Sequence, residues 1–308
     1  MAIKKELIQF VVVNSTGCGF DMPLFQQNVY SINATTKYSW DITGEDISCG
    51  TGSLVINGVV NKSNNKPSGN SKHQTQQHIR LVDSLSQYVY LTFDDGPQKG
   101  TVACMEVCKQ KNVKATFFMV GLHAQQKSDG KQIVAQIKQL YPQFLLANHS
   151  FTHAKEGYRS FYKQHEQTQH DFYKAQAYLS VPYNIIRLPG NNVWITQKIT
   201  KTNRQTLGVT QLLDSAGYNI IGWDAEWRFK KKTSNPVQSA EEMAWEIQRL
   251  LAKNKTRTPK HCMLLTHDRM FKEPAFADSL ARMIDILKTN EHIVFETCDK
   301  YPGLKPVK

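Results

Sequence analysis

From residue 88 onward, strand-like and helix-like segments alternate, and this alternation constrains the fold more than any other feature of the sequence. Short apolar runs typical of strands occupy residues 88–93, 115–120, 144–147, 185–187, 218–223, 262–267 and 292–295. Apolar residues at helical spacing separate them, near 100–111, 129–140, 156–179, 205–216, 239–250 and 275–287. Strands joined by amphipathic helices form parallel βαβ units. This many units predict an α/β barrel.

The first part of the chain has a different texture. Short apolar pieces alternate there with Gly, Asn, Ser and Thr clusters, and residues 61–80 contain almost no large apolar side chain. We therefore expect a small β-rich module with a polar linker over residues 1–80, and a main domain over 81–308. The apolar run 7–13 contains Gln9 and lacks a small-residue cleavage site, so a strand is predicted rather than a signal peptide. No stretch reaches the roughly 20 apolar residues of a membrane span.

The formal net charge of +12 raises the question of an anionic partner. The lysines are scattered, with one tight run at 230–232, and no nucleic-acid-binding module is visible, so no nucleic-acid partner is predicted. A solvated basic surface and attraction to an anionic cell-wall glycan both remain open. Of the six cysteines, Cys18 and Cys49 could pair in an oxidising compartment.

Unusual polar residues follow the carboxyl ends of several predicted strands. They are Asp94 and Asp95, His149 and His153, Arg187, Asp224 and Glu226, and His267. In parallel β/α barrels this rim carries the active site. Each motif alone has an ordinary explanation, a turn or surface histidines, but all of them meeting at one rim favours a site.

These residues form a plausible hydrolytic set. His149 and His153 stand four apart and would face one point if the segment took a helical turn. Two histidines and one carboxylate are a common catalytic zinc set. A second carboxylate beside such a metal can act as general base, and His267 is a candidate acid for a leaving group.

The ordered motifs resemble those of the polysaccharide deacetylase family, the NodB-homology domain or carbohydrate esterase family four. They are T-F-D-D-G-P (92–97), H-S-F-T-H (149–153), R-L-P-G (187–190), D-A-E-W (224–227) and L-T-H (265–267). The resemblance covers residues 86 to about 300. It implies a deformed (β/α) barrel of the polysaccharide deacetylase type and an acetylated polysaccharide as substrate.

The resemblance also implies roles for individual residues. Asp95, His149 and His153 would hold zinc, with Co²⁺ or Ni²⁺ as alternatives. Asp94 would be the general base on metal-bound water, Arg187 would orient Asp94, and His267 would be the general acid. A backbone N–H near Gly190 would stabilise the oxyanion, Leu265 would line the acetyl pocket, and Trp227 would form its aromatic wall.

Two motifs depart from the family pattern. The third has Gly190 where the family usually has Tyr, so the wall of the groove should differ. In the fourth, Glu226 precedes Trp227 and could orient His267, but Asp224 could do so instead. Tyr158, after the second motif, fits either a glycan groove or helix packing.

The expected function is removal of N-acetyl groups from a glycan of the chitin, peptidoglycan or poly-N-acetylglucosamine type. An O-acetyl esterase acting on an acetylated polysaccharide and a non-catalytic glycan-binding protein are the alternatives. Such substrates place the protein outside the cytoplasm, in the periplasm or beyond.

Overall fold

The computed structural model describes residues 47–50, 53–56, 86–155 and 157–306. The chain divides into two compact units, Met1–Ser84 and Leu85–Lys308. In the first unit, strands β1 (Ile47–Gly50) and β2 (Ser53–Ile56) pair antiparallel. The rest of the predicted N-terminal module, including Cys18 and the run 7–13, lies outside the described residues, as does the side chain of Cys49. The module and its disulfide therefore stay predictions.

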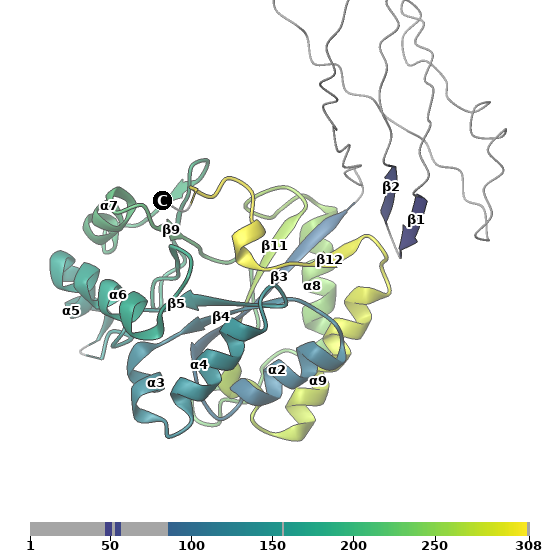
Figure 1. The fold of residues 1–308 in the computed structure, drawn as a ribbon, viewed down its shortest axis with the longest axis horizontal. Coiled ribbons are helices and arrows are strands. Elements are labelled where there is room, and N and C mark those ends of the chain that lie inside the picture. Colours follow the sequence, from purple (N-terminus) through teal and green to yellow (C-terminus); the bar gives the residue numbers. More distant parts are fainter. Residues whose placement is uncertain (1–46, 51–52, 57–85, 156, 307–308) are drawn as a thin grey trace, which may run out of the picture. The chain divides into compact units, whose positions relative to one another are not determined.

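One sheet organises the second unit (Figure 1). Its strands run in the order β10-β11-β3-β4-β5-β6-β9-β7-β8, and β12 also pairs with β3. Pairing is parallel from β10 to β9, whereas β7 and β8 form an antiparallel hairpin at one edge. The strands are β3 (Gln87–Gly96), β4 (Ala115–Met119), β5 (Phe144–Asn148), β6 (Ile185–Ile186), β7 (Trp194–Ile195), β8 (Thr200–Lys201), β9 (Asn219–Ile220), β10 (Ala225–Glu226), β11 (His261–His267) and β12 (Ile293–Phe295).

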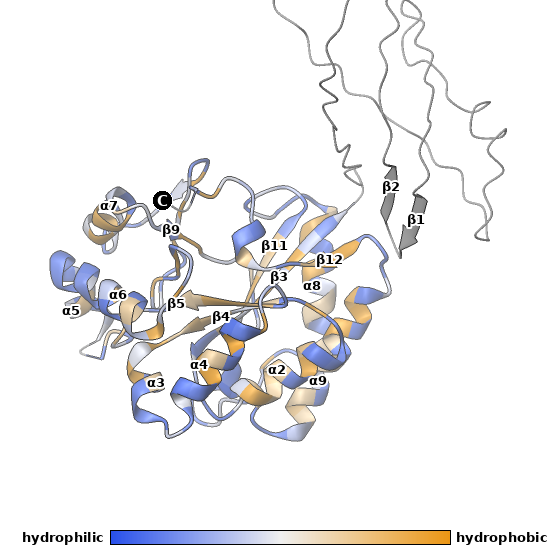
Figure 2. Ribbon diagram, in the orientation of Figure 1, coloured by the Kyte–Doolittle hydropathy of each residue, from blue (hydrophilic) through white to orange (hydrophobic). Residues whose placement is uncertain are grey.

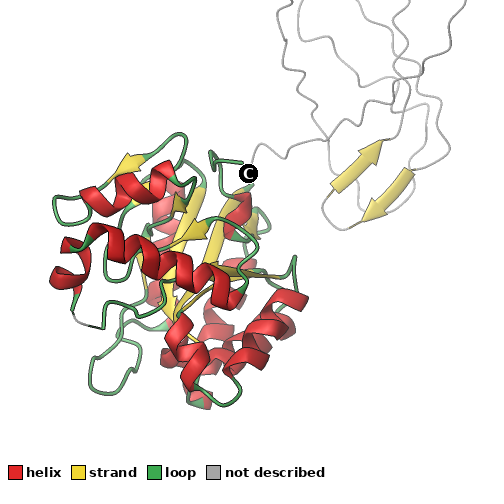
Figure 3. Ribbon diagram, turned by 60° about the vertical axis from the view of Figure 1, so that its left-hand side comes forward, coloured by secondary structure: helices red, strands yellow, loops and turns green. Residues whose placement is uncertain are grey.

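Helices surround the strands on the outside (Figure 3). They are α2 (Thr101–Gln110), α3 (Gly121–Gln126), α4 (Gly130–Gln139), α5 (Tyr158–Lys163), α6 (His165–Leu179), α7 (Leu207–Ser215), α8 (Ala240–Ala252) and α9 (Pro274–Lys288), with 3-10 turns η1 (Asp268–Phe271) and η2 (Cys298–Lys300). The sheet curls without pairing between its described end strands β10 and β8. The predicted deformed (β/α) barrel is confirmed.

Side chains along β3 alternate between two cores because successive residues of a strand point to opposite faces. Val89, Leu91 and Phe93 join the large apolar cluster beneath the helices. Tyr90 belongs to a second cluster inside the curled sheet, together with Phe118 of β4 and other aromatic side chains. Figure 2 shows the same arrangement, with apolar residues concentrated on the strands and on parts of the helices. Asp94 follows the inward series of β3 and therefore enters the open end of the barrel.

Several local predictions can be compared with these elements. The helix predicted near 239–250 is α8, and Ser239 and Glu242 form its capping box, with Ser239 Oγ accepting from the Glu242 N–H at 3.1 Å. The single helix predicted over 156–179 is instead two helices, because Gln164 leaves the helical region at φ −97° and ψ 74°. The short helix α3 and the β7–β8 hairpin were not predicted, since segments this short carry little periodic signal. None of the described helices is both long and apolar enough to cross a bilayer.

Candidate active site

Asp94 and Asp95 lie at the carboxyl end of β3, and a backbone irregularity brings both carboxylates to one point. The strand register shifts between Asp94 and Gly96, and Asp95 has a positive φ of 72°. Adjacent strand residues would otherwise point to opposite faces. With the bulge, Asp94 Oδ2 and Asp95 Oδ1 lie 3.5 and 3.4 Å from the same atom, His149 Nε2. The bulge therefore turns the Asp95 carboxylate back toward the side on which Asp94 lies.

His149 and His153 follow β5 on a loop rather than on a turn of helix. Ser150, His153 and Ala154 all have positive φ, at 70°, 54° and 56°. Asp171 of α6 holds the loop by accepting from the backbone N–H groups of Phe151 and Thr152, at 2.8 and 3.0 Å. The helical turn considered from the sequence is therefore wrong, although the two rings still converge, with centroids 4.9 Å apart.

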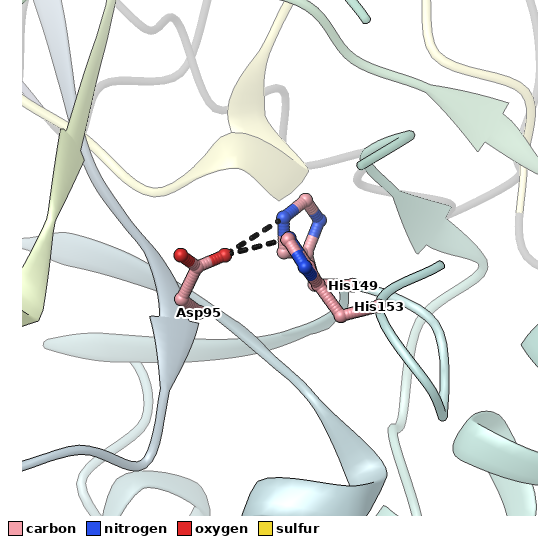
Figure 4. A group of neighbouring side chains, drawn as sticks. All are labelled: Asp95, His149 and His153. Carbon is pink, nitrogen blue, oxygen red and sulfur yellow. Dashed lines mark ion pairs between the residues drawn. The ribbon is translucent and has the colours of Figure 1, made fainter. Parts of the chain in front are cut away.

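Asp95, His149 and His153 form a group that could hold a metal ion (Figure 4). Their three ligand atoms lie within 4.8 Å of one another. Asp95 Oδ1 is 2.8 Å from His153 Nε2 and is buried without a hydrogen bond among the described residues. His149 Nδ1 lies 2.9 Å from the carbonyl oxygen of Arg187, which leaves Nε2 as the lone-pair donor. One acid oxygen and two imidazole nitrogens fit zinc.

The charge distribution also suits a cation. Burial opposes ionisation of Asp95, but the neighbouring His149 and His153 outweigh it and hold the pKa of Asp95 well below its usual range. Burial would lower the pKa of His149, yet Asp94 and Asp95 raise it. Both shifts have the same origin, because two carboxylates and two imidazoles share a nearly dry space and each stabilises the opposite charge.

Arg187 is fully buried and fixes Asp94. Its Nη1 donates to Asp94 Oδ1 at 2.8 Å and to Thr92 Oγ1 at 2.6 Å. Its Nε and Nη2 donate to the carbonyl oxygens of Ile221 and Gly222, at 3.1 and 2.9 Å. The guanidinium therefore has several fixed partners, and the Asp94 carboxylate has one defined orientation.

His267 ends β11 beside the acids. Its Nε2 lies 4.0 Å from Asp95 Oδ2, and Phe229 packs edge-on against the ring with centroids 4.8 Å apart. Burial lowers the pKa of His267 despite the attraction of Asp95 and Asp94. Its Nδ1 is buried and accepts or donates no hydrogen bond within the described part of the chain.

Neither acid of the fourth motif bonds to His267. Asp224 Oδ1 and Oδ2 accept from the backbone N–H groups of Arg257 and Met263, at 2.6 and 2.9 Å. The alternative in which Asp224 orients His267 is therefore wrong, because both its oxygens are committed to backbone. Glu226 is half-buried near Asp94, and burial raises its pKa. No hydrogen bond or ion pair joins it to His267 among the residues described.

The three residues predicted to bind substrate differ in position. Leu265 is buried on β11 two residues before His267, on the same face of the strand. Gly190 has a φ of 65°, and a Cβ there would lie 2.7 Å from the Tyr158 ring, so the glycine makes room for a tyrosine of another segment. Trp227 is fully buried and packs on Phe271, so the expectation of an aromatic pocket wall at Trp227 is corrected. It directly follows β10 and belongs to the large apolar cluster beneath the helices.

Sequence reasoning missed Arg269 and Asp268. Arg269 Nη2 contacts Asp95 Oδ2 as an ion pair, leaving Oδ1 toward the histidines. Asp268 is fully buried, hydrogen-bonded to Thr101, and burial raises its pKa to about 7. They are the two residues after His267, so extending the fifth motif by two positions would have included them. His123 also reaches the site, with Nδ1 2.6 Å from the Asp95 carbonyl oxygen.

Part of the chain resembles known polysaccharide deacetylases in sequence. Residues 82–211 match the family model described as polysaccharide deacetylase. A peptidoglycan-N-acetylglucosamine deacetylase of Bacillus cereus is 26% identical over 187 residues, which are 58% of this chain and 59% of that protein. A bifunctional xylanase/deacetylase of Pseudobutyrivibrio xylanivorans is 33% identical over 102 residues, 33% of this chain and 15% of that protein. The chain thus spans less than two thirds of these relatives.

Solved structures share the fold. The catalytic domain of a peptidoglycan N-acetylglucosamine deacetylase from Eubacterium rectale superposes with a TM-score of 0.53 at 20% identity, covering 74% of this chain and 96% of that one. A family 4 carbohydrate esterase from Streptomyces lividans gives 0.51 at 19% identity, covering 72% and 97%. At these identities the likeness concerns the fold.

Proposed function

Since this chain belongs to the polysaccharide deacetylase family, we propose that it is a metal-dependent hydrolase that removes N-acetyl groups from an acetylated polysaccharide. The substrate would be of the chitin, peptidoglycan or poly-N-acetylglucosamine type, and the protein would act outside the cytoplasm. One observation carries the proposal. The convergent atoms of Asp95, His149 and His153 adjoin a second buried carboxylate, Asp94, that a buried arginine orients.

Asp94 would be the general base. Arg187 occupies its Oδ1, so Oδ2 is the oxygen free to take a proton from an attacking water. Asp95, His149 and His153 would hold a divalent metal, zinc in the first instance, which when bound supplies Lewis acidity to the acetyl carbonyl and acidifies water. The backbone N–H near Gly190 would donate to the developing oxyanion, and Leu265 would contact the acetyl methyl.

His267 would protonate the departing amine. Its ring is restrained by Phe229 on one side and lies near the carboxylate of Asp95 on the other. Glu226 is half-buried near Asp94, and its carboxylate would act on His267 through its charge at a distance rather than through a hydrogen bond. Tyr158 would contribute the aromatic surface that the sequence assigned to Trp227, because its ring lies 6.2 Å from that of His153.

Acetate release from N-acetylglucosamine oligomers tests the proposal. The full chain would be stripped of metal and reloaded with zinc, beside Asp94→Asn and the exposed control Asp278→Asn. We expect release that requires metal, persists in Asp278→Asn and falls by roughly 100-fold or more in Asp94→Asn, the usual scale for general-base loss. Equal release by the wild type and Asp94→Asn would refute the assigned base, and zinc binding without release from any acetylated glycan would favour a binding protein.

The alternative O-acetyl esterase uses the same residues on a different leaving group. An alkoxide needs less proton assistance than an amine, so replacing His267 should slow ester hydrolysis less than amide hydrolysis. Comparing His267→Gln on O-acetylated xylan oligomers and on N-acetylglucosamine oligomers separates the two. A larger loss on the ester would contradict the acid role of His267.

A further inference from the structure

A basic pocket adjoins the proposed metal site. It is an open depression of about 520 Å³ lined by Gln98, Lys99, Lys127, Ser234, Arg269 and Lys272. Four of the six lining residues are cationic, and none is acidic. The pocket is joined to the metal-site residues through Arg269, whose Nη2 pairs with Asp95 Oδ2. A group in this pocket would therefore lie one side chain away from the reacting centre.

Two of these cations have no counter-ion within the part of the chain that the structure describes. Lys127 pairs with Asp129, and Arg269 pairs with Asp95. Lys99 and Lys272 are exposed, and no carboxylate of the described residues lies within ion-pair distance of either. Cations that lie close together without acidic partners repel one another. An anion that binds among them relieves part of this repulsion. Net positive charge in the pocket is thus available to a ligand.

The lysine run noticed in the sequence belongs to the same rim. Lys230 to Lys232 lie on the loop between β10 and α8, which also supplies Ser234 to the pocket. The loop closes on itself, with the Ser234 N–H donating to the Lys230 carbonyl oxygen at 2.7 Å. Phe229 anchors it against the His267 ring and beneath the Arg269 guanidinium, 5.5 Å from the ring centroid. The run is therefore held near the site and not on a remote surface.

We propose that this pocket is a subsite for an anionic substituent of the glycan, a carboxylate or phosphate group, with Lys99 and Lys272 as its main contacts. The proposal rests on the proposed deacetylase function and narrows the substrate to acetylated glycans that carry oxyanions beside the acetylated sugar. Arg269 would link the two sites, because it contacts both the pocket and Asp95. Neutral chitin-type polymers would then be bound less tightly.

Binding to matched glycans tests this subsite. The full chain carrying Asp94→Asn, to prevent turnover, would be titrated calorimetrically with peptide-free strands of alternating N-acetylglucosamine and lactyl-bearing sugar. One sample keeps the free carboxylates and the other has them as methyl esters. A third probe, N-acetylglucosamine oligomers bearing 6-phosphate, distinguishes phosphate from carboxylate. We expect the charged forms of one or both kinds to bind about tenfold tighter than the neutral form at low salt, since charge-assisted bonds contribute on that scale.

In the double variant Lys99→Gln/Lys272→Gln, the ratio of the affinities for the charged and the neutral glycan should fall to near one. The matched control, Lys253→Gln with Lys255→Gln at the carboxyl end of α8, removes the same charge from the opposite end of the barrel and should preserve it. An equal loss in both pairs, or no preference for any charged glycan, would overturn the subsite. Acetate release is measured separately, so a working deacetylase without charge preference refutes only the subsite, and charge preference without release refutes only the deacetylase.

Discussion

Replacement of Arg187 by Met tests how strongly the barrel interior depends on one buried ion pair. The substitution keeps much of the side-chain volume but removes the donors to Asp94, Thr92, Ile221 and Gly222. Asp94 is only 3% exposed, so its charge would be left without its closest counter-ion and largely without water. Removing one partner of a buried pair costs about 3–5 kcal/mol.

That cost has a measurable consequence. For a domain of this size about 3–5 kcal/mol corresponds to a fall in the melting temperature of roughly 6–20 °C. Urea unfolding of the wild type, Arg187→Met, Asp94→Asn and the double variant gives the coupling energy between the two side chains. We expect at least about 2 kcal/mol of coupling, because the double variant leaves neither charge buried alone.

An exposed pair provides the control. Arg282 and Glu241 form an ion pair in which the side chains are 67% and 51% exposed. Arg282→Met makes the same chemical change, and water should replace the lost partner with no resolvable change in stability. Similar losses in Arg282→Met and Arg187→Met, or additive effects of Arg187→Met and Asp94→Asn, would refute the assignment of the cost to burial of the pair.

The remaining predictions concern the metal group, the backbone and pH. Wild-type protein should bind zinc stoichiometrically by elemental analysis and melt at lower temperature after chelation, whereas His149→Gln should bind none and show no chelation effect; retained zinc would contradict the ligand set. Gly100→Ala should lose about 2–3 kcal/mol in urea unfolding, because the methyl would lie 1.8 Å from the Asp268 carbonyl oxygen and the backbone would have to move; unchanged stability would contradict this packing. Burial lowers the pKa of His261 to about 4 from 6.5, so the unfolded chain binds more protons between these values. Stability should therefore fall as pH drops from about 6.5 to about 4, more steeply than in His261→Gln; parallel curves would contradict this.

The fold class and most of the site were readable from the sequence because their signals are local. Alternating apolar runs and helical spacing come from the periods of 2 and 3.6 residues, and in parallel units they imply that strand ends share one rim. Asp94, Asp95, His149, His153 and His267 were therefore expected together, and the structure brings them together.

Only the tertiary structure decided how these side chains meet. The bulge at Asp95 and the left-handed loop before His153 are single-residue backbone choices with no periodic signal, yet they determine that both acids face His149. Trp227 is buried away from the site, and Tyr158 is the aromatic residue beside His153. The sequence could not distinguish the two, because an aromatic residue gives the same signal whether it packs beneath a helix or borders a groove. Lys99 lies far along the chain from Arg269 and Lys272, and their meeting in one pocket depends on contacts that only a folded barrel makes.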